Sequence, residues 1–167
     1  MKYIGNKYRL LDLIDSVFIQ EGLPSKGTLI DIFTGTTNVA QFYKKKGYRL
    51  ITNDFMTYSY VSQCAYIKNN QYPKFEKLIK AEQLKLRLEL IESKKNPLAT
   101  VLQYLNNLPG KEGFMFKHYA PGGMHARQFF SNENAKKIDA VRDKIQKWKT
   151  QKLINKSEYY ILLSSLI

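Results

Sequence analysis

The sequence predicts an α/β fold in which a βαβ unit near the N-terminus is followed by a mainly helical region. The first strand is an apolar run at residues 28–33 without polar alternation, which is typical of a parallel strand covered on both faces. An amphipathic segment and a second strand-length run at residues 48–53 complete the unit. Helical spacing prevails from about residue 70 onward. We therefore divide the chain into residues 1–70 and 71–167.

Three helices are expected to accompany the two strands. Apolar residues recur at helical spacing over residues 7–21, and Gly22 follows them. A small, polar turn at residues 34–38 leads into the second helix, which should end before Gly47. A third helix is expected at about residues 58–68. The crossover between the two parallel strands should be right-handed.

The second region is expected to consist of helices joined by one long loop. Helices are predicted at residues 73–95 and 99–105, and residues 109–128 should form an irregular loop rich in Gly, Pro and aromatic residues. Ser131 is a good N-cap for the next helix. Asn155, with a glutamate three residues later, resembles a capping box that opens the last helix.

The chain ends in an apolar helical segment at residues 159–167 that has no C-cap. One interpretation is a terminal helix that packs into the core. The sequence favours the other interpretation, that the chain is a fragment of a longer protein.

Composition narrows the class of protein. The 167 residues include 27 Lys and Arg against 14 Asp and Glu, so the formal net charge is +13. Such an excess favours a polyanionic partner, with nucleic acid ahead of a membrane surface. A single cysteine excludes a disulfide framework, and the two histidines suggest no zinc site. No apolar run approaches the ~20 residues of a membrane span. We expect a soluble, intracellular protein.

The first strand, its turn and the acid after the second strand form the strongest candidate site. Gly35 allows a ligand to approach the backbone closely, and the following helix offers free N–H groups. Asp54 lies roughly 20 residues further on, where an acid can accept both hydroxyls of a ribose. The remaining glycines of the dinucleotide fingerprint are absent, which disfavours a pyrophosphate site. The alternative is a structural turn with an exposed aspartate.

Several segments, taken together and in order, resemble the alpha (Dam-like) class of adenine-specific DNA methyltransferases. The sequence KYIGNK at residues 2–7 is similar to their N-terminal cofactor motif, and DIFTGT at residues 31–36 to their strand–turn motif. Residues 53–59 are similar to the motif whose acid takes the ribose. The segments at residues 129–142 and the helix with Tyr159 also resemble one branch of the family.

The resemblance implies a partial Rossmann-like S-adenosylmethionine-dependent methyltransferase fold with a helical insertion and the start of a target-recognition region. Asp54 would hold the ribose of S-adenosylmethionine, and Lys7 would lie near its methionine end. Thr37 departs from the pattern, because many relatives carry a second glycine there, and its Cβ is expected to crowd the turn. The residues that the resemblance assigns to the cofactor are Tyr3, Ile4, Gly5, Lys7, Asp31, Phe33, Thr34, Gly35, Thr36, Asp54 and Phe55.

Members of this class transfer the methyl group with a [DNS]-P-P-[YFW] tetrapeptide, and this chain contains no Pro-Pro. The resemblance therefore implies the N-terminal portion of a site-specific DNA adenine methyltransferase from a bacterial, cytoplasmic restriction–modification system. No catalytic residue is assigned, and we expect no activity from the chain alone. The implied partners are double-stranded DNA and a C-terminal catalytic portion or second subunit, without a metal.

Two further classes of function stay open at this point. One is a non-catalytic cofactor- or DNA-binding remnant, or a subunit of a split methyltransferase; the other is an unrelated basic nucleic-acid-binding domain. The basic and aromatic stretch from Phe114 to Phe129 could contact DNA through Lys117 and Arg127. The alternative for this stretch is a loop whose aromatic residues pack on the core.

Overall fold

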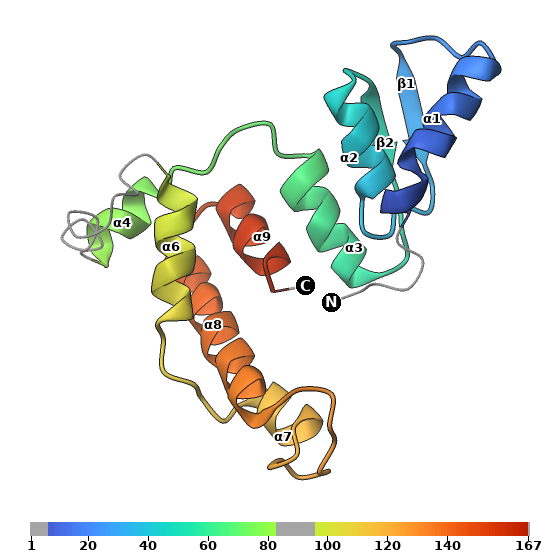
Figure 1. Ribbon diagram of the computed structural model, residues 1–167. Coiled ribbons are helices and arrows are strands. Elements are labelled where there is room, and N and C mark those ends of the chain that lie inside the picture. Colours follow the sequence, from blue (N-terminus) through green and yellow to red (C-terminus); the bar gives the residue numbers. More distant parts are fainter. Residues whose placement is uncertain (1–6, 83–95, 167) are drawn as a thin grey trace. The chain divides into compact units, whose positions relative to one another are not determined.

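The computed structural model describes residues 7–82 and 96–166 of the chain (Figure 1). These residues divide into two compact units at Gln71 and Tyr72. We call the N-terminal unit, up to Gln71, unit 1 and the segment Tyr72–Leu166 unit 2. Within the described residues, no helix has the length and hydropathy that a membrane span requires.

Unit 1 contains the predicted βαβ arrangement. Strands β1 (Thr28–Asp31) and β2 (Arg49–Thr52) are parallel, with Thr28 opposite Arg49 and Asp31 opposite Thr52. The fold is therefore mixed α/β with a small parallel sheet, as the sequence predicts. The helical elements of this unit are the 3₁₀ turn η1 (Tyr8–Leu10), α1 (Leu11–Gln20), α2 (Asn38–Lys45), α3 (Thr57–Ser62) and the π-helical turn η2 (Gln63–Ile67).

One face of this sheet is covered and the other is open. Leu29 and Leu50 are half-buried, and α2 packs against both strands. Ile30 and Ile51 alternate with them and are 62% and 47% exposed. The expectation that the first strand is covered on both faces is therefore wrong for the described part of the chain. The run shows no apolar–polar alternation because Ile30 is apolar although it lies on the face that no described element covers.

Aromatic packing and one lysine hold the helices of unit 1 together. The buried Tyr43 ring of α2 stacks on Phe18 of α1 with ring centroids 4.7 Å apart and meets Tyr48 edge-on. Lys44 extends from α2 and donates to three carbonyl oxygens at and just after the end of η2, those of Tyr66, Ile67 and Asn69. A cation at this position satisfies carbonyl groups that the helix itself leaves without donors.

Unit 2 is helical. It comprises α4 (Glu76–Ala81), α6 (Pro97–Asn106), α7 (Phe114–Tyr119), α8 (Asn132–Thr150) and α9 (Lys156–Ser164). The 19-residue helix α8 supplies Val141, Ile145 and Trp148 to the core, and α4, α6, α9 and the segments next to them supply the other side chains. The buried core side chains are Phe75, Leu78, Val101, Leu105, Val141, Ile145, Trp148, Ile154 and Leu162.

The structure confirms both predicted N-caps. Ser131 Oγ accepts the Asn134 N–H at the start of α8. At α9, Asn155 Oδ1 accepts the Glu158 N–H and Glu158 accepts the Asn155 N–H, both at 2.9 Å. Leu162 of α9 is fully buried in the core. Packing of this helix therefore accounts for the apolar sequence near residue 160.

Three predicted boundaries in unit 2 need correction. The loop expected over residues 109–128 contains α7, because Asp139 of α8 accepts hydrogen bonds from backbone N–H groups at its start. Helix α6 begins at Pro97 with Asn96 as its N-cap, since proline suits the first helical position. Of the helix expected over residues 73–95, α4 covers Glu76–Ala81 with Glu82 as its C-cap, and residues 83–95 lie outside the described residues.

Candidate functional site

The candidate site lies at the carboxyl ends of the two parallel strands, which is where open α/β sheets bind ligands. Two backbone hydrogen bonds continue the pairing beyond β1 and β2: Asn53 N–H donates to Asp31 O at 2.9 Å and Thr34 N–H donates to Asn53 O at 3.1 Å. As a result, the turn after β1 and the loop after β2 are held side by side.

Asp54 fixes these two loops to each other. Its Oδ2 accepts the Gly35 N–H at 2.7 Å, and its Oδ1 accepts the Met56 N–H at 2.9 Å. These backbone donors, Met56 first and Gly35 second, hold the pKa of the Asp54 carboxyl below its ordinary value. Asp54 is therefore a carboxylate at neutral pH. The Ser59 side chain and the Phe55 N–H also lower this pKa, so the carboxylate is already oriented by several donors.

The turn between β1 and α2 uses left-handed backbone at two positions. Gly35 has φ of +52°, which glycine adopts without strain. Thr37 has φ of +66°, an outlier for a β-branched residue, and is fully buried. Its Oγ1 accepts a hydrogen bond from Gln41 Nε2 at 2.8 Å. Thr37 therefore holds a left-handed conformation to which its buried hydroxyl bond contributes.

A small pocket opens beside this turn and contains a partly buried acid. Burial raises the pKa of Asp31, while the Phe33 N–H and then the nearby Lys7 act in the opposite direction. The pocket thus combines a carboxyl group that burial penalises with a cation close to it. Its lining residues are Lys7, Asp31, Phe33, Thr34, Gly35, Thr36, Asn38 and Val39.

Two aromatic side chains at this edge of the sheet are open to water. Phe33, in the turn after β1, is 77% exposed, and Phe55, in the loop after β2, is 98% exposed. Exposed rings on loops next to a pocket can pack against an apolar or aromatic group of a ligand.

The pocket brings together Lys7, Asp31 and Phe33–Thr36 among the residues that the sequence assigns to a cofactor. Asp54 does not line it but contacts it through the Gly35 N–H. Phe55 also lies outside the lining. Tyr3, Ile4 and Gly5 lie outside the described residues.

Asn38 and Val39 also line the pocket, although their residue types gave no sign of it in the sequence. Asn38 Nδ2 donates to Thr36 Oγ1 at 2.9 Å. Their place at the first positions of α2, directly after the turn, is the signal that could have identified them. Lys117 and Arg127, the predicted DNA contacts, are exposed residues of unit 2. Among the residues that the structure describes, no group of His, Cys, Asp and Glu could hold a metal.

Comparison with known proteins gives one family and a set of methyltransferase relatives. The family description "D12 class N6 adenine-specific DNA methyltransferase" matches residues 3–167. Over its whole length the chain is 36% identical to the modification methylase StsI of Streptococcus sanguinis, 35% to the type II methyltransferase M.NlaIII of Neisseria lactamica and 33% to M.FokI of Planomicrobium okeanokoites. It spans 23%, 44% and 24% of these proteins. No solved structure matches the chain.

Proposed function

Because the chain belongs to the family of D12 class N6 adenine-specific DNA methyltransferases, we propose that it forms the cofactor-binding part of a site-specific DNA adenine methyltransferase. Unit 1 is then a partial Rossmann-like domain for S-adenosylmethionine, corresponding to residues 1–70. Residues 71–167 form a helical insertion and the start of the target-recognition region. When bound, the cofactor supplies the electrophilic methyl group for the exocyclic amine of adenine.

The bridging position of Asp54 is the observation that carries this proposal. The carboxylate already fixes the turn and the loop through Gly35 and Met56. A ribose whose hydroxyls donate to this carboxylate would bind to a group that is already oriented. The exposed rings of Phe33 and Phe55 are available to cover the adenine.

The charges of the pocket suit the methionine end of the cofactor. Its ammonium group would neutralise Asp31, whose pKa burial raises, and its carboxylate would pair with Lys7. The ligand would therefore relieve the cost of burying the Asp31 carboxylate, because a charge is unfavourable when partly buried.

A panel of ligands tests this arrangement by separating the two ends of the cofactor. Asp31→Asn is expected to weaken binding of S-adenosylmethionine and to leave 5′-methylthioadenosine, which lacks the amino-acid end, unaffected. Asp54→Ala should weaken the binding of both ligands. Glu21→Gln, which changes an exposed acid of unit 1, should weaken the binding of neither. If Asp31→Asn lost the same affinity for both ligands, the assignment of the methionine end to Asp31 would be contradicted.

The open face of the sheet favours a second candidate, a subunit of a split enzyme or a remnant that no longer catalyses. Parallel sheets are normally covered on both faces, whereas Ile30 and Ile51 lie on a face that no described element covers. Co-purification with a separately expressed catalytic portion would favour the split enzyme. Binding of cofactor without any such partner in the native source would favour the remnant.

A further inference from the structure

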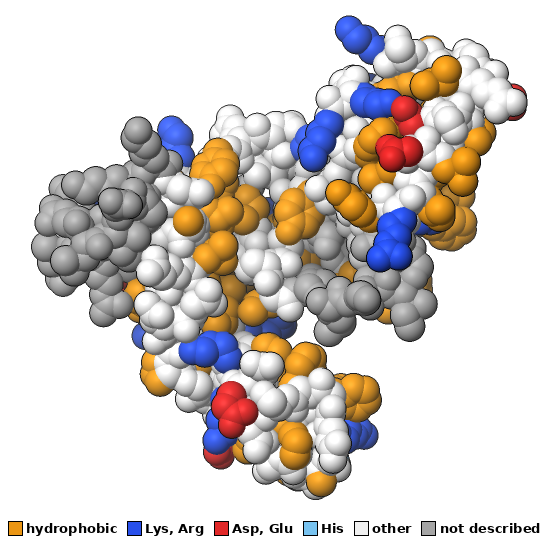
Figure 2. All heavy atoms as spheres, in the orientation of Figure 1, with side chains coloured by type: hydrophobic (Ala, Val, Ile, Leu, Met, Phe, Trp, Pro, Cys, Tyr) orange, Lys and Arg blue, Asp and Glu red, His pale blue; other side chains and the backbone are white. Residues whose placement is uncertain are grey.

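Unit 2 presents exposed aromatic and apolar side chains at the end that carries α7. We call residues 113–131, which comprise α7 and the loop after it, the aromatic tip. Phe114, Met124 and Phe129 are 63%, 73% and 70% exposed. Figure 2 shows hydrophobic side chains at the surface over α7 and this loop.

The rings of the tip form a continuous series. His118 and Phe114 have ring centroids 4.6 Å apart, and His118 and His125 are 5.4 Å apart. On the other side, Tyr119 lies 6.0 Å from Phe114 and 5.8 Å from Phe129. Five rings therefore follow one another along the tip, with flat faces and edges near the surface.

The aromatic tip is an ordered segment that packs around a small hydrophobic core. Phe116 and Ala120 of the tip pack on Ala135 of α8. Met124 N–H donates to Lys117 O at 2.7 Å, and a Cβ on Gly123 would lie 2.2 Å from Phe116 O. This close approach requires glycine, because a side chain would collide with the backbone. The exposed rings are thus displayed on a closed loop whose interior is already packed.

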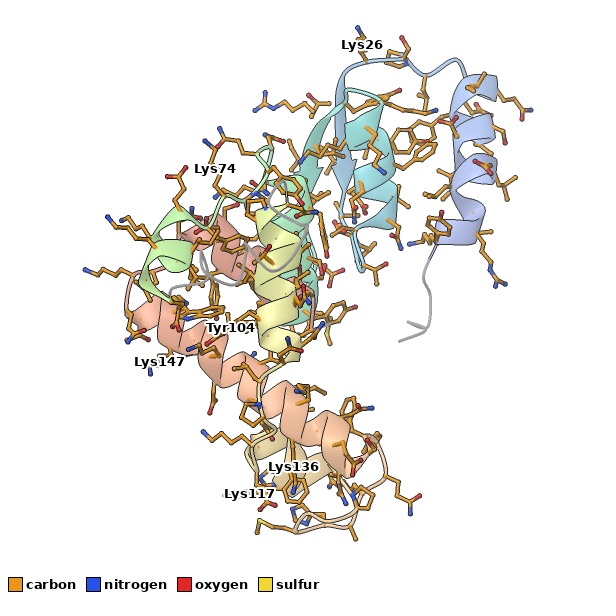
Figure 3. The ribbon with its side chains drawn as sticks, turned by 60° about the vertical axis from the view of Figure 1, so that its left-hand side comes forward. Lys26, Lys74, Tyr104, Lys117, Lys136 and Lys147 are labelled. Atoms are coloured by element: carbon orange, nitrogen blue, oxygen red, sulfur yellow. The ribbon has the colours of Figure 1, made fainter. Side chains whose placement is uncertain are left out.

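The charge of the tip suits an anionic partner. Residues 113–131 contain Lys117, Arg127 and two histidines but no Asp or Glu. The Arg127 guanidinium lies 5.8 Å from the centre of the Tyr119 ring, and no carboxylate among the described residues pairs with Lys117 or Arg127. Figure 3 shows Lys117 and Lys136 at this end of unit 2. Stacking surfaces next to cations are the combination that binds unpaired nucleic-acid bases.

We propose that the aromatic tip stacks on an unpaired DNA base while Lys117 and Arg127 hold the adjoining phosphates. The proposal rests on the proposed function only for the choice of DNA as the nucleic acid. It assigns a base-binding surface to unit 2, whereas the pocket beside the turn belongs to unit 1. The base can come from a single strand or from a nucleotide displaced from a duplex, since both expose the same flat surface.

The test uses 2-aminopurine, a base whose fluorescence decreases when an aromatic side chain stacks on it. The full chain is titrated into three DNAs: a single strand with 2-aminopurine, a duplex with 2-aminopurine opposite an abasic site, and a fully paired duplex. We expect quenching with one or both of the first two, and the comparison between them identifies the source of the base.

The variants separate stacking from charge. The double variant Phe114→Ala, Phe129→Ala is expected to lose the quenching and to bind the unpaired base about tenfold more weakly or worse. The double variant Lys117→Gln, Arg127→Gln should reduce the salt dependence of binding. Matched controls outside the tip, Ile19→Ala and Lys147→Gln, change an exposed apolar residue and an exposed cation and should change neither quantity.

Unchanged quenching and affinity in the Phe114→Ala, Phe129→Ala variant would overturn the proposal and leave the tip for another partner, such as a protein. The absence of quenching with every DNA would also overturn it. Binding of S-adenosylmethionine is measured on the same samples. Loss of that binding with the quenching intact would count against the function proposed for unit 1 and not against the tip.

Discussion

Asp31 and Asp54 are both residues of the candidate site, yet the structure shifts the pKa values of their carboxyl groups in opposite directions. Burial raises the pKa of Asp31, and backbone donors lower the pKa of Asp54. The sequence predicts both residues as acids at the ends of adjacent strands. It could not predict these opposite environments, because the Asp54 contact with Gly35 joins residues 19 apart in the chain.

The pKa of Asp54 leads to a prediction about stability. A carboxyl group whose pKa is lower in the folded protein stabilises the fold above its ordinary pKa of 3.8, and this contribution is lost as the pH falls through the lowered folded-state pKa. Asp54→Asn should therefore reduce the free energy of unfolding at pH 6, and the deficit should shrink as the pH falls below 3.8. Urea unfolding across this range measures it. A deficit independent of pH would show that the charge of Asp54 is unimportant.

Asp31 should behave in the opposite way. Its raised pKa means that protonation favours the folded state, so the charged form costs stability above the folded-state pKa. We expect Asp31→Asn to be at least as stable as the natural chain at pH 7 while binding cofactor more weakly. Urea unfolding with and without ligand tests both parts. A clear loss of stability at pH 7 would contradict the electrostatic cost assigned to this group.

Thr37 provides a test of backbone strain. Thr37→Ala and Thr37→Gly both remove the hydroxyl bond to Gln41, but only glycine also removes the Cβ at φ of +66°. The glycine variant should therefore be more stable than the alanine variant by about 1 kcal/mol. Urea denaturation of the two variants measures this difference, and equal stabilities would show that the left-handed conformation carries no strain.

At the scale of elements, local signals predicted the structure where the stabilising partners are close in sequence. The caps at Ser131 and Asn155 and the end of α2 near Gly47 follow from such signals. The strands β1 and β2 were predicted from their apolar runs, although they pair with each other across α2. Helix α7 could not be predicted, because the acid that caps it lies on another helix. The open face of the sheet was also missed, since an apolar run does not reveal which of its faces is covered.

Asp139 is expected to determine whether α7 forms. Its carboxylate accepts the backbone N–H groups of Gly113, Met115 and Phe116 at 2.9 to 3.1 Å. Asp139→Ala would leave these donors without a partner and should destabilise unit 2 by about 3 kcal/mol. Asp143→Ala, an exposed acid on the same helix, is the control and should have a small effect. Hydrogen exchange at residues 114–119 reports α7 directly, and unchanged protection there in Asp139→Ala would contradict this role.

At the scale of the whole molecule, the chain matches its relatives along its full length but spans less than half of each. It contains no Pro-Pro tetrapeptide of the kind that contacts the target adenine in this class. The resemblance predicts the family, and the match over residues 3–167 confirms it.

The partial coverage of the relatives and the missing Pro-Pro tetrapeptide lead to a prediction about methyl transfer. The chain alone should transfer no methyl group from radiolabelled S-adenosylmethionine to DNA. Transfer should appear when the chain is joined to, or mixed with, the remaining part of a methyltransferase such as M.NlaIII, to which it is 35% identical. The control joins the same part to the Asp54→Ala variant, which should restore much less methyl transfer. Methyl transfer by the chain alone would contradict the assignment of catalysis to another segment.

Binding of the cofactor by the chain itself is the most direct test of the central claim. We would titrate S-adenosylmethionine into the folded 167-residue chain by calorimetry, beside Asp54→Ala and Glu21→Gln. The expected result is saturable binding that Asp54→Ala weakens by about 2–3 kcal/mol, roughly 30- to 150-fold, while Glu21→Gln is unaffected. Equal binding by Asp54→Ala, or no binding by a sample shown to be folded, would contradict it.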